Sequence, residues 1–134
     1  MKYVFDSSSI FILAEKKQFK YFTDGFTLSL AKYEIGNILW KEHHLFHRIT
    51  AKELEEMISI YEDVFRNMDV FDVGGHLGYI SKMASRLGIS FYDASYVYFA
   101  SKEGCFLITA DIGLAKRAHQ EIKVLRPDDL INGV

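Results

Sequence analysis

Cysteine, proline and long apolar runs are scarce in this sequence of 134 residues. The one cysteine, Cys105, cannot form an internal disulfide, and no Cys/His spacing typical of a zinc site is present. No apolar run approaches the roughly 18 residues that cross a bilayer, and the N-terminal segment has no apolar stretch like that of a signal peptide. The one proline is Pro127, and no repeat marks a domain boundary. We therefore expect a single cytosolic domain over residues 1–134 that does not associate with membranes.

An excess of positive charge is also missing, since the net charge is −2. The overall charge therefore does not by itself indicate a nucleic-acid partner. Basic residues do gather locally, although a solvated surface is the alternative interpretation of each group. These groups are Lys16, Lys17 and Lys20; Lys41 and Arg48 among three histidines; and Lys116 with Arg117.

Short apolar runs alternate with segments of helical periodicity, which predicts an α/β fold with a mostly parallel sheet wrapped by helices. In the helix expected at 31–43, Tyr33, Gly36 and Trp40 lie opposite the main apolar stripe, which suggests a helix covered on two faces. The helix expected at 92–102 is apolar nearly all round, as in a buried central helix. The expected strands are 3–5, 27–30, 70–73, 105–108 and 122–125. Four further helical segments are expected. One is capped by Thr50 and Glu53, one ends at Gly88, one spans 112–119, and a final turn of helix spans 127–131.

Four acidic residues stand where strands end or helices begin. Asp6 ends the first strand, and Asp111 follows the strand at 105–108. Asp93 opens the buried helix, and Glu34 lies in the first turn of the helix expected at 31–43. Because parallel strands place their carboxyl ends on one edge of a sheet, where ligands bind, we expect the four carboxylates to converge on one pocket.

Each of these acids also has a purely structural interpretation. Asp6 and Asp111 could cap helices, Ser90 and Asp93 have the spacing of a capping box, and Glu34 could complement a helix dipole. Asp93 is the hardest to explain in this way, because a carboxylate on a buried helix needs a partner. Several carboxylates crowded together repel one another unless a cation joins them, and oxygen ligands alone select ions such as Mg²⁺ or Mn²⁺.

Four segments carry a resemblance to a known family. They are Val4-Phe5-Asp6-Ser7-Ser8-Ser9-Ile10, Leu28-Ser29-Leu30-Ala31-Lys32-Tyr33-Glu34-Ile35, Gly88-Ile89-Ser90-Phe91-Tyr92-Asp93-Ala94-Ser95-Tyr96, and Leu107-Ile108-Thr109-Ala110-Asp111. In this order, they resemble the motifs of PIN-domain ribonucleases, and among these the VapC-type toxins of prokaryotic toxin–antitoxin systems. The resemblance covers essentially the whole chain. One departure is that residues 112–114 add no further acid after the fourth motif.

The resemblance implies a three-layer α/β/α PIN-like fold with a five-stranded sheet, and an endoribonuclease that depends on Mg²⁺ or Mn²⁺. Asp6, Asp93 and Asp111 would hold the ion, and Glu34 would bind a second ion or orient the attacking water. Ser8 and Thr109 would orient the carboxylates, with local capping as the alternative. Lys16, Lys17 and Lys116 are the candidates for contacts with RNA phosphates.

Partners are also implied. Aromatic residues on the helices exceed what a small core needs, which favours a homodimer as in the resembled family, with extra core packing as the alternative. These residues are Tyr33, Trp40, Tyr96, Tyr98 and Phe99. The family further implies a small antitoxin whose C-terminal segment blocks the acidic pocket.

Other functions remain open at this point. An RNA-processing PIN nuclease without an antitoxin would have the same motifs, and so would a catalytically silent PIN-fold binding module. A receiver-type phosphorylation domain fits poorly, because Asp6 is followed by Ser7 and Ser8 rather than preceded or followed by another acid.

Overall fold

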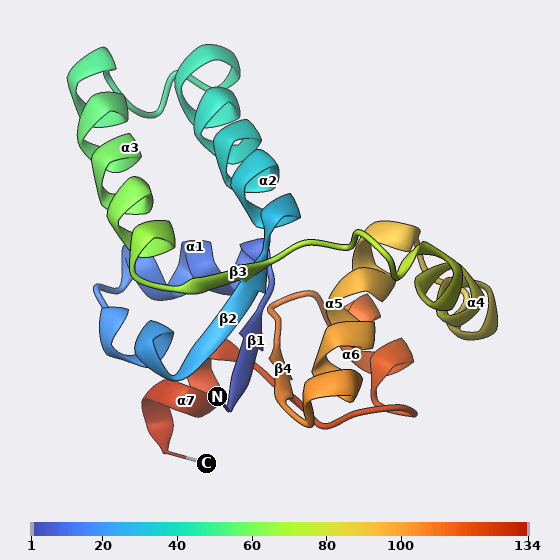
Figure 1. The fold of residues 1–134 in the computed structure, drawn as a ribbon. Coiled ribbons are helices and arrows are strands. Elements are labelled where there is room, and N and C mark those ends of the chain that lie inside the picture. Colours follow the sequence, from blue (N-terminus) through green and yellow to red (C-terminus); the bar gives the residue numbers. More distant parts are fainter. Residues whose placement is uncertain (1, 134) are drawn as a thin grey trace.

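The computed structural model describes residues 2–133, in which five parallel strands alternate with helices (Figure 1). The strands are β1 (Tyr3–Phe5), β2 (Gly25–Leu28), β3 (Asp69–Phe71), β4 (Phe106–Ile108) and β5 (Val124–Leu125). The α-helices are α1 (Ser7–Glu15), α2 (Ser29–Trp40), α3 (Ala51–Arg66), α4 (Leu77–Leu87), α5 (Phe91–Glu103), α6 (Ile112–Ala118) and α7 (Pro127–Asn132). A 3-10 helix, η1 (Phe19–Asp24), and a π-helical turn, η2 (Lys41–Leu45), complete the described elements.

The strand order in the sheet is β3-β2-β1-β4-β5. Val4 of β1 pairs with Phe26 of β2 on one side and with Leu107 of β4 on the other, and all pairs are parallel. The chain builds the sheet outward from β1 in one direction and then returns to add β4 and β5 in the other. The order therefore reverses between β1 and β4, and the carboxyl ends of these two strands flank the point where such sheets bind ligands.

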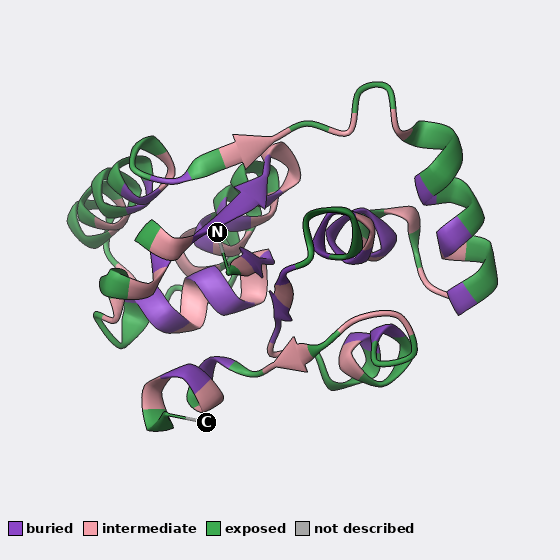
Figure 2. Cartoon of the chain, turned by 60° about the horizontal axis from the view of Figure 1, so that its bottom comes forward, coloured by how far each residue is buried: buried purple, intermediate pink, exposed green. Residues whose placement is uncertain are grey.

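The alternation of side chains along each strand separates two cores, one on each face of the sheet. Val4 and Leu107 belong to the core covered by α4, α5 and α6. Their neighbours Phe5 and Ile108 belong to the core covered by α1, α2, α3 and α7. Figure 2 shows the buried residues of the strands between these two groups of helices. The three-layer α/β/α architecture expected from the sequence is thus confirmed.

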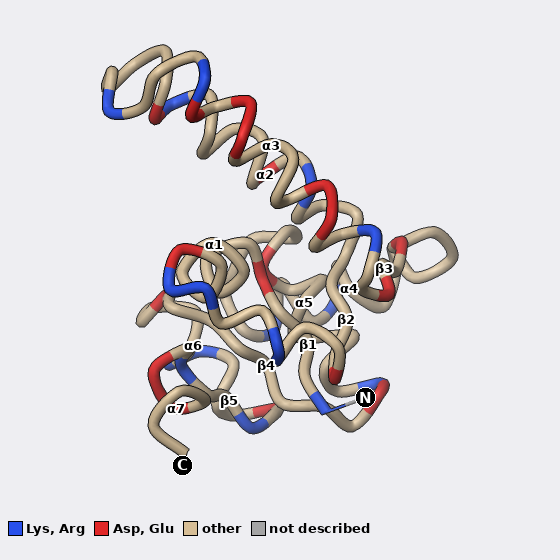
Figure 3. The backbone as a smooth tube through the Cα atoms, turned by 90° about the vertical axis from the view of Figure 1, so that its left-hand side faces the viewer, with Lys and Arg blue, Asp and Glu red and all other residues tan. Residues whose placement is uncertain are grey.

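Helices α2 and α3, joined through η2, form a helical hairpin over residues 29–66 that we call the arm. The arm projects away from the sheet in Figures 1 and 3. The capping box expected at its second helix is present, because Thr50 accepts from the Glu53 N–H and Glu53 accepts from the Thr50 N–H. Among residues 2–133, no helix combines the length and apolar character needed to cross a membrane.

Two expectations about α2 are wrong. The strand expected at 27–30 lies at Gly25–Leu28, so α2 begins at Ser29 and Glu34 lies in its second turn rather than its first. The shift brings Gly25 and Phe26 into the strand, where they pair with Tyr3 and Val4 of β1. Residues 2–133 also leave the outer face of α2 uncovered: Tyr33 is 79% exposed and Trp40 is 48% exposed.

The close approach of β1 and β2 depends on the absence of a side chain at Gly25. A Cβ there would overlap the Tyr3 carbonyl oxygen and lie 2.7 Å from Phe5 Cε2. We therefore expect Gly25→Ala to lower the free energy of unfolding by about 1–3 kcal/mol, as overpacking usually does. Urea denaturation would measure this change in the free energy of unfolding.

Gly36 is the matched control, because it is exposed in α2 with nothing within 4 Å of an added Cβ. Gly36→Ala should raise stability by about 0.5–1 kcal/mol; an unchanged stability in Gly25→Ala would contradict the steric argument.

Candidate active site

Asp6 directly follows β1 and is almost fully buried, with 6% of its surface exposed. Its Oδ1 accepts from Ser8 Oγ at 2.8 Å and from the Ser9 N–H at 2.9 Å, and its Oδ2 accepts from Thr109 Oγ1. Burial raises the pKa of Asp6 above its ordinary value, while the hydrogen bonds from Thr109, Ser9 and Ser8 act in the opposite direction. Asp6 therefore caps α1 and is at the same time fixed against the end of β4.

Asp111 and Thr109 follow β4, next to the end of β1. The Thr109 hydroxyl donates to Asp6 and accepts from the Asp111 N–H at 3.1 Å. Asp111 Oδ1 accepts from the Leu114 N–H at 3.0 Å and so caps α6. Ser8 Oγ accepts from the Ala110 N–H at 3.1 Å. These bonds tie the two strand ends together, and the capping interpretations of Asp6 and Asp111 are both correct without excluding a second role.

Asp93 lies in the first turn of α5, whose N-cap Ser90 accepts from the Asp93 N–H at 3.1 Å. Its side chain is partly buried. Burial raises the pKa of Asp93, and the charges of Asp111 and Asp6 raise it further, against a lowering by the Ser90 hydrogen bond. The electrostatic effect of Asp111 and Asp6 on Asp93 shows that α5 brings its carboxylate toward the edge where β1 and β4 end.

Glu34 reaches the same region from α2. Its Oε1 accepts from the Tyr96 hydroxyl at 2.8 Å, and the Ser7 side chain also forms a hydrogen bond with it. Burial raises the pKa of Glu34, the hydrogen bonds from Tyr96 and Ser7 lower it, and the charges of Asp6 and Asp93 raise it. Glu34 is therefore held between α1 and α5, close to two of the three aspartates.

The four acids influence one another electrostatically, but they are not gathered into a ready coordination sphere. No group of three or more Asp, Glu, His or Cys side chains within residues 2–133 is placed so that it could hold a metal ion. The full convergence expected from the sequence is thus not present. Asp6 and Asp111 each accept a hydrogen bond from a backbone N–H of the helix that they cap, and Glu34 accepts from Tyr96 of α5. These three carboxylates are thus already engaged by donors of the protein.

The donor set nevertheless suits a hard divalent cation. All four side chains offer carboxylate oxygens, which Mg²⁺ and Mn²⁺ prefer. Within the described part of the chain, no lysine, arginine or histidine forms an ion pair with Asp6, Glu34, Asp93 or Asp111. Their mutual repulsion is therefore not relieved by a basic side chain, and a cation would relieve it.

The lysines predicted to contact RNA lie in different places. Lys16 and Lys17 follow the C-terminal end of α1, while Asp6 caps its N-terminal end, and nine helical residues at a rise of about 1.5 Å separate them. Lys16 is also paired with Asp128 at 2.9 Å. Lys116 is exposed on α6, the helix that Asp111 caps. Elsewhere, as on the arm, basic and acidic positions are interspersed (Figure 3).

The aromatic residues predicted to form a homodimer surface fall into two sets. Tyr96 and Phe99 are buried in the core under α5, so they are not available for a partner. Tyr98 is partly buried, and Tyr33 and Trp40 are exposed on α2. The contact of Tyr96 with Glu34 was not anticipated from the sequence. The spacing of three residues between Asp93 and Tyr96 puts both on one face of a helix, but it does not indicate a contact with Glu34.

Two curated proteins of Pyrobaculum aerophilum are similar to this chain. "Exonuclease VapC9" is 30% identical over 129 residues, covering 92% of this chain and 91% of that protein. "Ribonuclease VapC3" is 34% identical over 91 residues, covering 68% of this chain and 69% of that protein. A scan against protein-family models finds no match.

Solved structures agree with this similarity. The crystal structure of PAE2754 from Pyrobaculum aerophilum has a TM-score of 0.81 at 28% identity and covers 98% of this chain and 95% of that one. The DNA-bound VapBC structure from Salmonella typhimurium has a TM-score of 0.66 at 16% identity and covers 95% of this chain and 98% of that one. This similarity shows the shared fold. The acids at the strand ends, the three-layer fold and the two curated relatives together lead to one conclusion: this chain belongs to the VapC family of PIN-domain proteins.

Proposed function

We propose that this protein is a divalent-metal-dependent endoribonuclease, the toxin of a VapBC-type toxin–antitoxin system. The observation that carries the proposal is the grouping of Asp6, Glu34, Asp93 and Asp111 at the ends of β1 and β4. They come from four separate segments, and no basic side chain of residues 2–133 pairs with them. The charges of Asp111 and Asp6 raise the pKa of Asp93, and the charges of Asp6 and Asp93 raise that of Glu34. A structural role alone does not require four such acids near one edge of the sheet. The similarity to proteins named as a ribonuclease and an exonuclease supports the same reaction class.

In this proposal each residue has a stated role. Asp6, Asp93 and Asp111 would hold Mg²⁺ or Mn²⁺, and Glu34 would bind a second ion or accept a hydrogen bond from the attacking water and so orient it. A bound divalent cation supplies positive charge that stabilises the negative charge developing on the phosphate. Ser8 and Thr109 would keep Asp6 in place through the hydrogen bonds already described.

The RNA would lie across the edge of the sheet that carries the acids. Of the three predicted lysines, Lys116 is the one nearest in sequence to a proposed metal ligand, since it is exposed five residues beyond Asp111. Lys16 and Lys17 would contact only RNA that extends past the far end of α1. The cytosolic location expected from the sequence stays a prediction.

The proposed partner is a small antitoxin, because the structural neighbours include VapBC complexes. Its C-terminal segment would cover the acidic edge. We also propose a homodimer contact through the outer face of α2, where Tyr33 and Trp40 are exposed about two helical turns apart.

The test is a cleavage assay on an unstructured RNA labelled at its 5′ end. With Mg²⁺ or Mn²⁺ we expect internal fragments, and with excess EDTA we expect none; added metal should restore cleavage. Mononucleotides appearing without internal fragments would indicate an exonuclease instead. No cleavage together with no Mn²⁺ binding by calorimetry would overturn the proposal and favour a silent binding module.

A further inference from the structure

Tyr96 stands out among the buried tyrosines because its hydroxyl bonds to a carboxylate of the candidate site. The ring is 2% exposed and packs in the core under α5, together with Val97 and Phe99. The hydroxyl donates to Glu34 Oε1 at 2.8 Å. This bond joins two helices that are distant in sequence, α5 and α2, at the point where the acids gather.

The bond restricts a side chain that would otherwise be mobile. Glutamate loses up to about 2 kcal/mol of rotamer entropy when it is ordered, and Glu34 is only partly buried on α2. A donor on a ring fixed in the core orders it before any ligand binds. Because Asp93 and Tyr96 are three residues apart on α5, the helix that presents one acid also sets the position of another.

The chemical nature of the donor matters as well. Lysine or arginine would fix Glu34 too, but would neutralise its charge. A tyrosine hydroxyl is a neutral donor at physiological pH, so its bond leaves the charge of Glu34 in place. Glu34 is therefore held in place with its negative charge available to a cation.

We infer that Tyr96 is a positioning residue of the metal site, which holds the Glu34 carboxylate where a divalent cation can use it. This inference rests on the proposed function, since it assumes that Glu34 takes part in metal binding. Tyr96 is thus a site residue in addition to the four acids and to Ser8 and Thr109, whose hydroxyls bond to Asp6.

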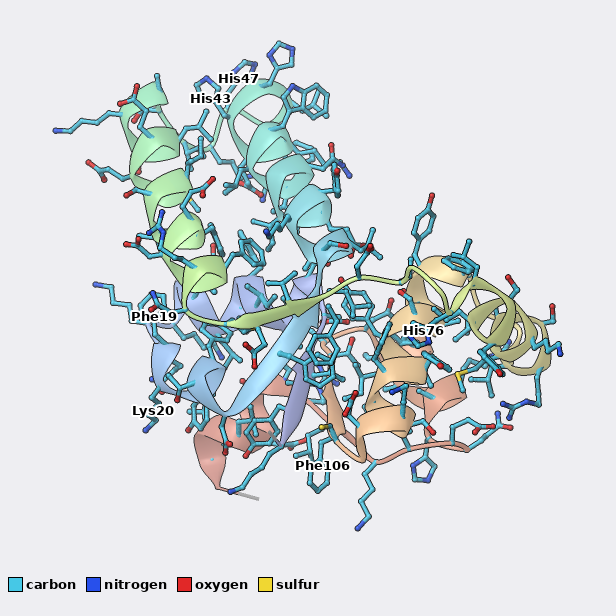
Figure 4. The ribbon with its side chains drawn as sticks, in the orientation of Figure 1. Phe19, Lys20, His43, His47, His76 and Phe106 are labelled. Atoms are coloured by element: carbon cyan, nitrogen blue, oxygen red, sulfur yellow. The ribbon has the colours of Figure 1, made fainter. Side chains whose placement is uncertain are left out.

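The test measures Mn²⁺ affinity by calorimetry in the wild type and in Tyr96→Phe. Removing the hydroxyl should weaken Mn²⁺ binding by about tenfold, since the loss of an outer hydrogen-bond partner of a metal ligand typically costs 10–100-fold. The matched control is Tyr98→Phe on the same helix. The Tyr98 hydroxyl bonds to His76 Nδ1 at 2.8 Å instead of to an acid, and Figure 4 shows His76 beside α5. Tyr98→Phe should leave Mn²⁺ affinity within about twofold of the wild type.

A double variant separates positioning from a general structural effect. If Tyr96 acts through Glu34, Glu34→Gln and the double variant Glu34→Gln/Tyr96→Phe should bind Mn²⁺ equally weakly. A further loss in the double variant, or wild-type affinity in Tyr96→Phe, would overturn the inference while leaving the proposed function standing. Absence of Mn²⁺ binding by the wild type would overturn both. Thermal unfolding without metal checks that each variant is folded, and Ser7→Ala, which removes the second hydrogen bond to Glu34, gives an independent variant with the same expected direction.

Discussion

Asp93→Asn should reduce RNA cleavage by at least about a thousandfold while leaving the protein folded, because a bound cation lowers the barrier by several kcal/mol and each 1.36 kcal/mol is a factor of ten in rate. Asparagine keeps the shape of the side chain and removes the charge that would bind the ion. The charges of Asp111 and Asp6 raise the pKa of Asp93, and the charge of Asp93 in turn raises that of Glu34, so Asp93 interacts with all three other acids. Single-turnover cleavage of a labelled RNA measures the effect.

Asp69→Asn is the control for this experiment. Asp69 is exposed at the first residue of β3, at the opposite end of the parallel strands from the acids. This variant should cleave at the wild-type rate. Metal-dependent cleavage by Asp93→Asn at the wild-type rate would refute the assignment of Asp93.

Mn²⁺ should stabilise the protein strongly near neutral pH and weakly in mild acid. At a free concentration about a hundredfold above its dissociation constant, a ligand that binds only the folded state adds about 2.7 kcal/mol to the free energy of unfolding. The same carboxylates must be deprotonated to bind, so protons compete with the metal as the pH falls. Guanidinium denaturation with and without Mn²⁺, at about pH 5 and about pH 7.5, measures both effects.

Without metal, the contribution of these acids to stability has the opposite trend. The pKa values of Asp6, Glu34 and Asp93 are raised in the folded state. The folded protein therefore holds their protons more tightly than the unfolded chain, and their contribution to stability is full below the unfolded pKa values. This contribution to stability is lost as the pH rises through the pKa values of the acids in the folded protein. Asp93→Asn should flatten this dependence and also reduce the stabilisation by Mn²⁺. An equal Mn²⁺ effect in that variant would contradict a shared metal site.

Several parts of the candidate site could be predicted from local sequence. Asp6 and Asp111 stand directly after apolar strands, and the parallel sheet that those strands predict must bring their ends to one edge. The hydrogen bonds of Ser8 and Thr109 also follow from short spacing, since Ser8 is two residues from Asp6 and Thr109 is two residues from Asp111. The roles of these residues in catalysis remain predictions.

Other parts could not be predicted because they depend on packing between distant segments. The sequence predicts that Tyr96 is one of the aromatic residues available to a homodimer. In the structure Tyr96 is buried, and its hydroxyl donates to Glu34, which is 62 residues away in the sequence. The sequence predicts a covered outer face of α2, but Tyr33 and Trp40 on this face are exposed. Periodicity shows that a face is apolar and does not show what packs against it.

The sequence by itself determined the α/β class, the parallel sheet and the identity of the four acids, because side-chain periodicity and strand-end position are local properties of the chain. Only the tertiary structure decided how these acids relate to one another. The strand order places the reversal between β1 and β4, beside Asp6 and Asp111, and the packing of α5 against α2 brings the Tyr96 hydroxyl to Glu34. Distances between side chains from separate segments result from the packing of the whole domain, which no single stretch of sequence encodes.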